Sequence, residues 1–520
     1  MADIVVGVDI GTTGVKAVAL GVDGTVYARD QQRVQHNFPQ PGHAEQDPLA
    51  LAAAVAHVVA AVVAALRANG HRLRGLSFSS AMHGIFAIDG AGRPLTPMLT
   101  WADTRAGRQA EELRHALPDL YQRTGVPMHP MLPAAKLRWL RDEWPGFHRA
   151  ARFVSFKQWL LYQLCGRYVE DHATAAAAGL QNVRALDWDQ DVLRETGVSA
   201  DQLGELVPCS ALLTLSSGAW LERLGLEESV PVIVGATDGL LATVGSGVFG
   251  PRMYSVTAGT SGAVRKMSAD VELDPRGRTF SYVLDREHWV TGGATNNVGL
   301  ALSWLAEQVG VPTQPPGGDQ AMLAAFEAAA SAPVGAEGLL FLPYLSGERA
   351  PHWNERARGV FFGLDVRHTR EHMLRAGIEG AALALRSIHD LLAPSTAPDA
   401  VVRASGGLFH SALWCQLVAD VLGTAVELTD QEEVSGAGAA HYGFFALGQY
   451  RQLEDIQACV RVRARYEPVE EHVRIFDRRF AVFQDVYRRV EPCFDRTGAG
   501  LGPGAGDGAG PEDGSPGPRA

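Results

Sequence analysis

One turn motif occurs twice in this chain, and it constrains the fold more than any other feature. The segment VDIGTTG from Val8 to Gly14 is matched by VTAGTSG from Val256 to Gly262, and each is a strand-like run that enters a Gly-Thr-hydroxyl-Gly turn. Self-similarity on this scale indicates a duplicated domain. The copies begin near residues 4 and 252, so we expect two similar α/β domains, 1–245 and 246–490, that face each other.

Length and composition agree with this division. The chain has 520 residues, 46% hydrophobic and 20% charged, which is globular and too long for one core. A formal charge of -12 argues against nucleic-acid or anionic-membrane partners. The five cysteines are scattered and show no metal-ligand spacing, and we expect no secretory signal at the start of the sequence. We therefore expect a cytoplasmic protein without structural zinc.

Local patterns predict most elements. A β-meander is expected over residues 4–8, 15–20 and 25–28, further strands at 76–79, 85–88, 230–234 and 401–404, and helical structure over 104–164 and 411–422.

The apolar run Leu49–Leu66 is long enough for a membrane span. However, Asp47 can cap it, Pro48 suits its first turn and Gly70 can end it, so we expect a buried helix. Residues 497–520 are almost wholly Gly, Pro, Ala, Asp and Ser and are expected to be disordered.

The repeated turn offers backbone N–H groups and hydroxyls to an anion such as phosphate. One copy alone would be an ordinary hairpin turn, whereas two matched copies favour phosphate binding. Asp9, which has no acidic counterpart at Thr257, could hold Mg²⁺ through water or could simply stabilise the hairpin.

Asp238 follows a buried-looking strand and lies between Thr237 and Gly239, at the edge where α/β proteins bind ligands. A carboxylate there could accept the proton of a hydroxyl that attacks phosphorus, or it could be a helix cap. Gly406-Gly407, between a strand and a helix, would let a nucleotide approach the backbone.

Together these segments resemble the FGGY carbohydrate kinases of the actin/Hsp70/hexokinase-like superfamily, from about Ile4 to about Gly448. The first phosphate motif of that family is similar to 9–16, the second to 257–262, the adenosine motif to 405–411, and a family signature to GLLFLPYLSGERAPHWN at 338–354. The resemblance implies two ribonuclease H-like domains with an active-site cleft between them.

The resemblance also implies site residues, with ATP as co-substrate and Mg²⁺ as the metal. It makes Asp238 the general base and Asp9 the metal-associated carboxylate. The implied nucleotide and phosphate contacts are Gly11, Thr12, Thr13, Lys16, Gly259, Thr260, Gly299, Ser303, Gly407 and Ser411. The implied sugar-side positions are Met82, His83, Asp103 and Gly239.

The substrate-side segments 79–83, 100–105 and 123–131 are most similar to those of gluconokinases. Xylulokinases usually have Gln where this chain has Ala81, and glycerol kinases have Arg-Glu where it has Met82-His83. The resemblance therefore implies phosphorylation of the sugar acid D-gluconate by ATP. A pentulose kinase such as xylulokinase is the alternative enzyme, and an actin- or Hsp70-like ATPase without a sugar substrate is the alternative class.

Gluconate carries a carboxylate, so the site should offer it a cation or several donors. Lys136, Lys157, Arg105 and His83 are the candidates, and each could equally form a structural ion pair. Relatives are often homodimers, so a homodimer is possible.

Overall fold

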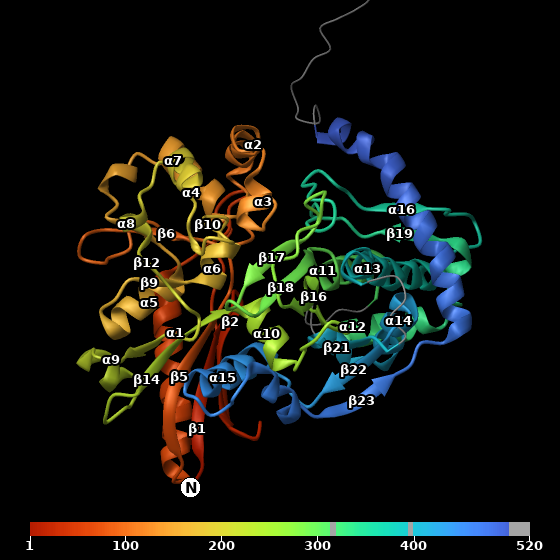
Figure 1. Cartoon of the computed structure of the whole chain (residues 1–520). Coiled ribbons are helices and arrows are strands. Elements are labelled where there is room, and N and C mark those ends of the chain that lie inside the picture. The colour runs from red at the N-terminus through yellow and green to blue at the C-terminus, as the bar shows by residue number, and fades with distance from the viewer. Residues whose placement is uncertain (312–318, 394–398, 499–520) are drawn as a thin grey trace, which may run out of the picture.

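The computed structural model describes residues 1–311, 319–393 and 399–498. A mixed β-sheet forms the centre of each of two domains (Figure 1). The first sheet runs in the order β13 (Leu212–Thr214), β14 (Pro231–Thr237), β5 (Arg72–Ser80), β1 (Asp3–Ile10), β2 (Gly14–Gly21) and β3 (Val26–Arg33). The second runs in the order β17 (Phe280–Val283), β18 (Trp289–Thr295), β16 (Gly262–Ser268), β15 (Met253–Ala258), β21 (Val401–Ser405), β22 (Ala425–Thr429) and β23 (Val462–Tyr466).

The second sheet repeats the pairing of the first. In the first, β1, β2 and β3 are antiparallel neighbours, β5 and β14 continue the sheet in parallel, and β13 closes it antiparallel. In the second, β15, β16 and β18 are antiparallel, β21 and β22 are parallel, and β23 closes the edge antiparallel. This correspondence confirms the expected duplication, and β17 is an extra strand on the second sheet.

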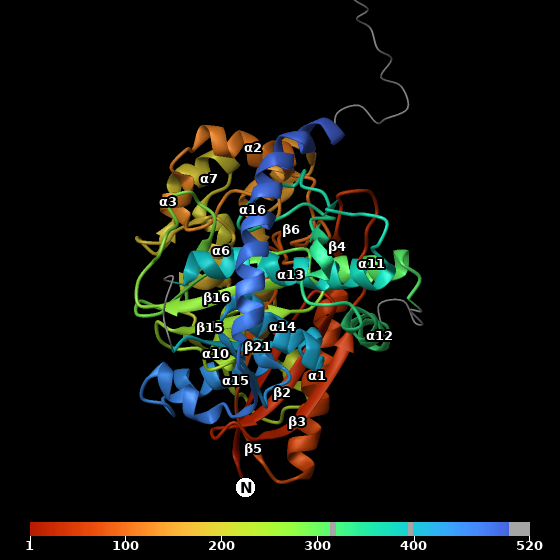
Figure 2. The same cartoon turned by 90° about the vertical axis from the view of Figure 1, so that its right-hand side faces the viewer.

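The remaining strands form small two-stranded sheets: β4 (Glu45–Gln46) with β7 (Met98–Leu99), β6 (Phe86–Ile88) with β8 (Arg152–Val154), β9 (Val169–Asp171) with β12 (Glu205–Val207), β10 (Gln181–Asn182) with β11 (Asp187–Trp188), and β19 (Leu340–Leu342) with β20 (Val360–Phe362). The first-domain helices are α1 (Pro48–Ala68), α2 (Gly107–Ala116), α3 (Leu120–Thr124), α4 (Pro133–Glu143), α5 (Phe156–Cys165), α6 (His172–Ala177), α7 (Gln190–Thr196), α8 (Ala200–Leu203), α9 (Gly218–Arg223) and α10 (Asp238–Gly245). Those that follow are α11 (Gly299–Gln308), α12 (Asp319–Ala330), α13 (Arg370–Leu392), α14 (Ala412–Leu422), α15 (Val434–Ala446) and α16 (Glu470–Gly498), which runs along the outside of the second domain (Figure 2). Short 3-10 helices lie at Phe147–Arg149, Ala336–Gly338, Gly407–His410 and Leu453–Cys459.

α1 begins as its sequence predicts. Asp47 accepts a hydrogen bond from the Leu49 backbone N–H at 2.9 Å, and Pro48 is the first helical residue. Among the described residues α1 is the one helix long and apolar enough to cross a membrane, but 56% of its apolar window is buried inside the protein. Its buried side chains share one core with β1 and β5.

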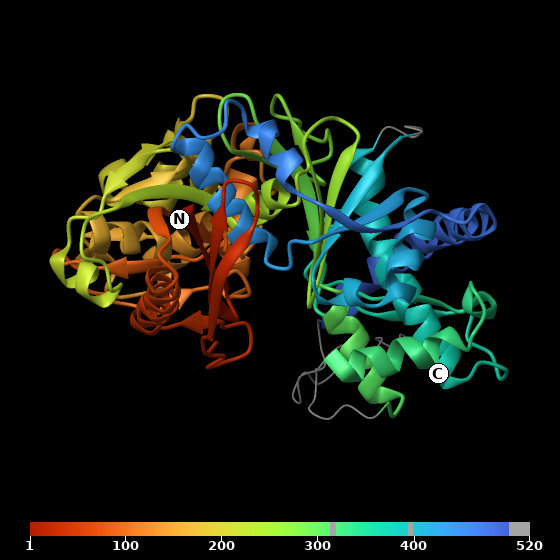
Figure 3. The same ribbon diagram turned by 90° about the horizontal axis from the view of Figure 1, so that it is seen from below.

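α15 comes from the second half of the sequence yet packs on the first sheet, beside α10 (Figure 3). Glycines permit this contact. A Cβ on Gly7 of β1 would lie 1.9 Å from the Gly436 carbonyl oxygen, and one on Gly438 would lie 1.9 Å from that of Leu241. The start of α10, which carries Asp238, is thereby held between the first sheet and α15.

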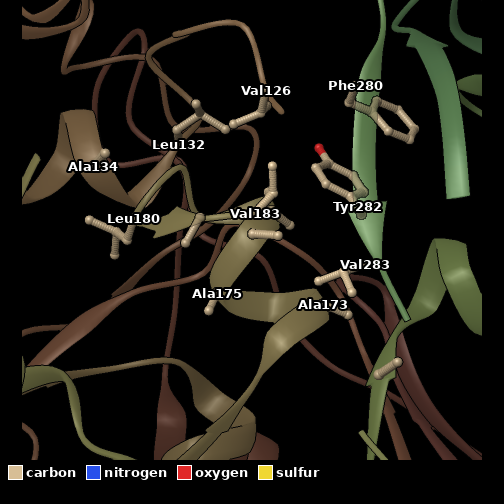
Figure 4. Close-up of a cluster of buried hydrophobic side chains, with 14 of the residues drawn as sticks. Val126, Leu132, Ala134, Ala173, Ala175, Leu180, Val183, Phe280, Tyr282 and Val283 are labelled. Carbon is tan, nitrogen blue, oxygen red and sulfur yellow. The ribbon is translucent and has the colours of Figure 1, made fainter. Parts of the chain in front are cut away.

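The two domains also meet along β17. Phe280 and Tyr282 of this second-domain strand belong to the same buried cluster as Val126 and Val183 of the first domain, and the Tyr282 ring points toward the two valines (Figure 4). Continuous apolar packing therefore closes one side of the boundary between the domains.

The structure differs from the expected elements in one region. Residues 104–164 are not uniformly helical, because β8 interrupts them and pairs antiparallel with β6. Phe153 and Val154 favour a strand, and both are buried in this pairing. The predicted tail, 497–520, lies outside the described residues apart from Thr497 and Gly498, where α16 ends.

Candidate active site

Asp238 stands where β14 turns into α10. Gly235 has φ +70° and lies so close to β5 that a Cβ there would be 1.8 Å from the Phe78 carbonyl oxygen. Thr237 is the extended N-cap and Asp238 is the first residue of α10, where the positive end of the helix dipole favours a carboxylate. One carboxylate oxygen, Oδ1, accepts a hydrogen bond from the Gly239 N–H at 2.7 Å.

Asp9, near the end of β1, lies close enough to Asp238 for their charges to interact. The Ser79 hydroxyl donates to Asp9 Oδ1 at 2.8 Å. Burial and the negative charge of Asp238 raise the pKa of Asp9 to about 7. Burial also raises the pKa of Asp238, while the Arg265 guanidinium opposes that rise.

These two carboxylates fit a hydrated Mg²⁺ that arrives with phosphate groups. Mg²⁺ is usually bound through one or two carboxylates together with substrate phosphates and water. Within 1–311, 319–393 and 399–498, no group of three or more His, Cys, Asp or Glu side chains could hold a metal by itself. Asp9 and Asp238 can therefore hold a Mg²⁺ ion whose remaining ligands are substrate phosphates and water, but they do not form a complete metal site by themselves.

A cavity of about 190 Å³ lies between the domains, and we call it the central cavity. Its first-domain side is formed by Thr12, Met82, His83, Trp101, Met131 and Asp238. Its second-domain side includes Thr257, Ser261, Arg265, Tyr282, Arg349 and Trp353. The structure thus brings the predicted base, the Met-His pair and both repeated turns to one space.

Lys136 holds the first-domain wall of the central cavity in shape. His83 has φ +68°, which costs energy in a residue other than glycine. The buried Lys136 ammonium donates to the His83 carbonyl oxygen at 2.9 Å and to that of Thr100, beside Trp101, at 2.6 Å. Burial, with the charges of Lys136 and Arg349, puts the His83 pKa well below its ordinary value, so its imidazole is neutral.

A second cavity, of about 540 Å³, lies in the second domain, and we call it the nucleotide-side cavity. Six predicted residues line it: Gly259, Thr260, Gly299, Ser303, Gly407 and Ser411. The N–H groups of Gly299 and Leu300, at the start of α11, donate to the carbonyl oxygens of Gly259 and Thr260, each at 2.9 Å. The second turn therefore separates the two cavities and touches both.

The predicted residues of the first turn and its flank do not all line the same cavity. Gly11 donates its N–H to the Gly14 carbonyl oxygen at 3.0 Å, and Gly11 and Thr12 line a small hollow beside the central cavity. Thr13 belongs to the same turn, where its carbonyl oxygen accepts a hydrogen bond from the Val34 N–H at 3.2 Å. Lys16 lies in a separate groove, and its ammonium pairs with Glu433 at 2.7 Å.

Asp103 does not reach the central cavity, although Trp101 of the same segment does. It is fully buried, and its Oδ2 accepts hydrogen bonds from the Ala44 N–H at 2.8 Å and from Arg105 Nε at 2.9 Å. These contacts fix the loop that carries Trp101. Gly239 lies beside the cavity, against the Arg265 guanidinium.

Of the four candidates for a carboxylate contact, only His83 lines the central cavity. Lys157 forms a fully buried ion pair with Asp171 at 2.7 Å, Arg105 pairs with Glu45 at 2.6 Å, and Lys136 bonds to backbone carbonyls. Among the described residues, the cations that line the cavity are Arg265 and Arg349, neither of which was predicted from the sequence. An arginine in a buried strand directly after the second turn is a signal that could have identified Arg265.

Comparison with known proteins agrees with this geometry. Residues 4–245 match the model of the N-terminal domain of the FGGY family of carbohydrate kinases, and residues 254–447 match that of its C-terminal domain. The chain is 34% identical to the gluconokinase of Bacillus subtilis (strain 168) over 94% of this chain and 97% of that protein.

Two solved structures from Lactobacillus acidophilus have the same fold. A ligand-bound xylulose kinase has a TM-score of 0.89 at 27% identity and covers 95% of this chain and 100% of that one. A gluconate kinase has a TM-score of 0.88 at 28% identity and covers 96% of this chain and 100% of that one. With both domain models matched in order across two similar halves, the chain belongs to the FGGY family of carbohydrate kinases.

Proposed function

We propose that this protein transfers the γ-phosphoryl group of ATP to the terminal hydroxyl of D-gluconate and forms 6-phosphogluconate and ADP. One observation carries the proposal: Asp238, Met82 and His83 line the same central cavity, and the second turn borders both this cavity and the nucleotide-side cavity. A sugar hydroxyl and a nucleotide phosphate can therefore meet beside a carboxylate.

In the proposed reaction Asp238 accepts the proton of the terminal hydroxyl as its oxygen attacks the γ-phosphorus. The new O–P bond forms while the bond from the γ-phosphorus to the bridging oxygen of ADP breaks, and ADP leaves with that electron pair. Asp238 must come within about 2.6–3.2 Å of the hydroxyl. The N–H groups and hydroxyls of both turns bind the phosphates, and closure of the domains excludes water. Mg²⁺, held near Asp9, would supply positive charge to the phosphates.

Charge in the central cavity supports a sugar acid. Arg265 and Arg349 line it, and His83 is neutral. A neutral ketose would leave both guanidinium groups without an anionic partner from the sugar, whereas gluconate supplies one. The gluconokinase relative supports the same choice. Phosphorylation of a pentulose is the second candidate, favoured by the equally close fold of the xylulose kinase.

A panel of acceptors with ADP release as the readout tests the proposal. We expect rapid ADP release with D-gluconate, much slower release with D-xylulose, and a low background without sugar. Faster turnover of xylulose would favour the second candidate, and equal release without any sugar would show an ATPase.

The five cysteines are free thiols in the structure, which supports a reducing cytoplasmic location. A homodimer stays a prediction.

A further inference from the structure

Two buried guanidinium groups face the central cavity from the second domain. Arg265 lies on β16, and Arg349 lies between β19 and β20. Across the described parts of the chain, neither lies within 4.0 Å of a carboxylate, and the Nε of each has no hydrogen-bond partner. A buried cation without an anion in direct contact is costly in free energy, so these groups call for an anionic ligand in addition to the more distant charges of Asp238 and Glu348.

The two arginines differ in how many contacts with the protein offset the free-energy cost of burying their charge. Arg349 donates from Nη2 to the Thr295 carbonyl oxygen at 3.2 Å and lies 5.3 Å from the centre of the Trp101 ring, a cation–π contact. Arg265 is 8% exposed, and within the part of the chain that the structure describes its one hydrogen bond runs from Nη1 to the Thr257 hydroxyl at 3.2 Å. Arg265 is therefore the cation with the greater need of a ligand.

Gly239 explains how this guanidinium fits beside the base. A Cβ at position 239 would lie 3.0 Å from both Nε and Nη2 of Arg265 and 3.0 Å from Met82 Cε. The missing side chain leaves room for the guanidinium between Asp238 and the Met-His pair. Gly239 thus serves the site by making space, in addition to any contact of its own backbone with the substrate.

The other cations near the sugar side are already engaged. Lys157 is paired with Asp171, and Lys136 donates to two backbone carbonyls. Arg105 is shared between Glu45 and Asp103. Moving any of them to a substrate would leave a buried partner unsatisfied, whereas a substrate carboxylate at Arg265 would satisfy donors that have no partner.

We propose that Arg265 binds the carboxylate of the sugar acid with its planar fork of donors and that Arg349 adds a second positive charge. Arg265 then sets the preference of the enzyme for an acid over a neutral sugar of the same shape. This inference rests on the proposed function, because it takes gluconate as the acceptor. The transferred phosphoryl group is the other anion that could reach Arg265, and the experiment separates the two.

The experiment compares D-gluconate with D-gluconamide, its neutral counterpart, in the wild type and Arg265→Gln. We expect the variant to lose about 100-fold in kcat/KM for gluconate, mostly through KM, because a charged contact of this kind is worth about 2–5 kcal/mol. At a pH well above the acid limb set by Asp238, kcat/KM for gluconamide should change by less than about threefold. Arg265→Lys keeps the charge but not the planar fork of donors, so its kcat/KM for gluconate should lie between the values of the wild type and Arg265→Gln.

Arg349→Gln is the matched comparison and should reduce the preference for gluconate less than Arg265→Gln does. If Arg265→Gln fails to fold, Gly239→Ala provides a second route, because its Cβ displaces the guanidinium and should raise the gluconate KM selectively. Equal losses on both acceptors would overturn the inference and point to the phosphoryl group. A selective loss in Arg349→Gln alone would also overturn it. If the wild-type enzyme does not phosphorylate gluconate, that result would instead contradict the proposed function.

Discussion

Asp238 combines three features that suit a general base: it starts a helix, it faces the central cavity, and its carboxylate has one hydrogen bond among the described residues, from Gly239. Asp238→Asn keeps the shape but cannot accept the proton. We expect kcat to fall by about a thousandfold or more while ATP affinity stays within about threefold. Asp399→Asn, at an exposed pair with Arg252, is the control and should be fully active. Full activity in the Asp238→Asn variant would remove Asp238 from this role.

The pH dependence of kcat/KM follows from the same carboxylate. Burial raises the pKa of Asp238 above that of an ordinary aspartate, and Arg265 limits the rise. A base acts only when it is deprotonated, so activity is lost as pH falls through this raised value. Arg265→Gln removes the opposing charge and should move the acid limb of the gluconamide profile to higher pH. An unchanged limb would show that Arg265 and Asp238 do not interact in the working enzyme.

Asp9 should make stability depend on pH in a defined direction. Its folded pKa of about 7 lies above the ordinary 3.8, so its contribution to stability is present at low pH and is lost as pH rises through about 7. Asp9→Asn avoids this loss. We expect the gain of the variant over the wild type to be about 2–3 kcal/mol larger at pH 8 than at pH 5 in denaturant titrations, because the loss builds up between about pH 4 and pH 7. A gain that is the same at both pH values would contradict the burial of a charged Asp9.

At the scale of elements, the start of α11 is fixed to the second turn. A Cβ on Gly299 would lie 2.4 Å from the Gly259 carbonyl oxygen, so Gly299→Ala must push α11 away from the turn. We expect the KM for ATP to rise about tenfold or more while gluconate binding, measured by calorimetry without nucleotide, is unchanged. Gly218→Ala, where a Cβ meets nothing within 4 Å, is the matched control. Unchanged ATP kinetics in Gly299→Ala would show that this contact does not shape the nucleotide-side cavity.

Elements with strong local signals could be predicted from the sequence, and those that depend on distant partners could not. α1 follows from Asp47 and Pro48, and the predicted helix over 411–422 is α14, capped by Ser411. β8 forms because β6, far back in the chain, accepts it as a partner.

The same reasoning applies to single charges in the site. Asp238 and the two turns could be predicted because they stand at the ends of strands, whereas Ser303 of α11 and Ser411, the N-cap of α14, were implied only by the family resemblance. Lys157 could not be assigned, because its spacing does not reveal that it pairs with Asp171. Asp103 was expected at the sugar side and is buried against Ala44 and Arg105 for the same reason. Arg265 was missed since only the fold places its side chain beside Gly239.

At the scale of the whole molecule, Ser411 is the last of the described residues that line the two cavities. A chain that lacks residues 497–520 should therefore keep full activity and the same thermal midpoint. Comparison of kcat/KM and Tm between the full and shortened chains checks this. A large loss of either would show that the end of the chain serves the site or the fold.

In the proposed function the duplication yields one active site from two similar halves, because only the first copy carries Asp9 and only the first domain supplies Asp238. The second copy offers Thr257 and a cavity for the nucleotide. The account therefore predicts a single acceptor hydroxyl and a single product for each chain.

The position of the transferred phosphate tests this account most directly. Phosphorus NMR of the product formed from D-gluconate and ATP should show one phosphate monoester coupled to the two protons of the terminal CH₂ group, and Asp238→Asn should form none. A phosphate on a secondary carbon, or no product from gluconate while xylulose is phosphorylated, would contradict the central claim.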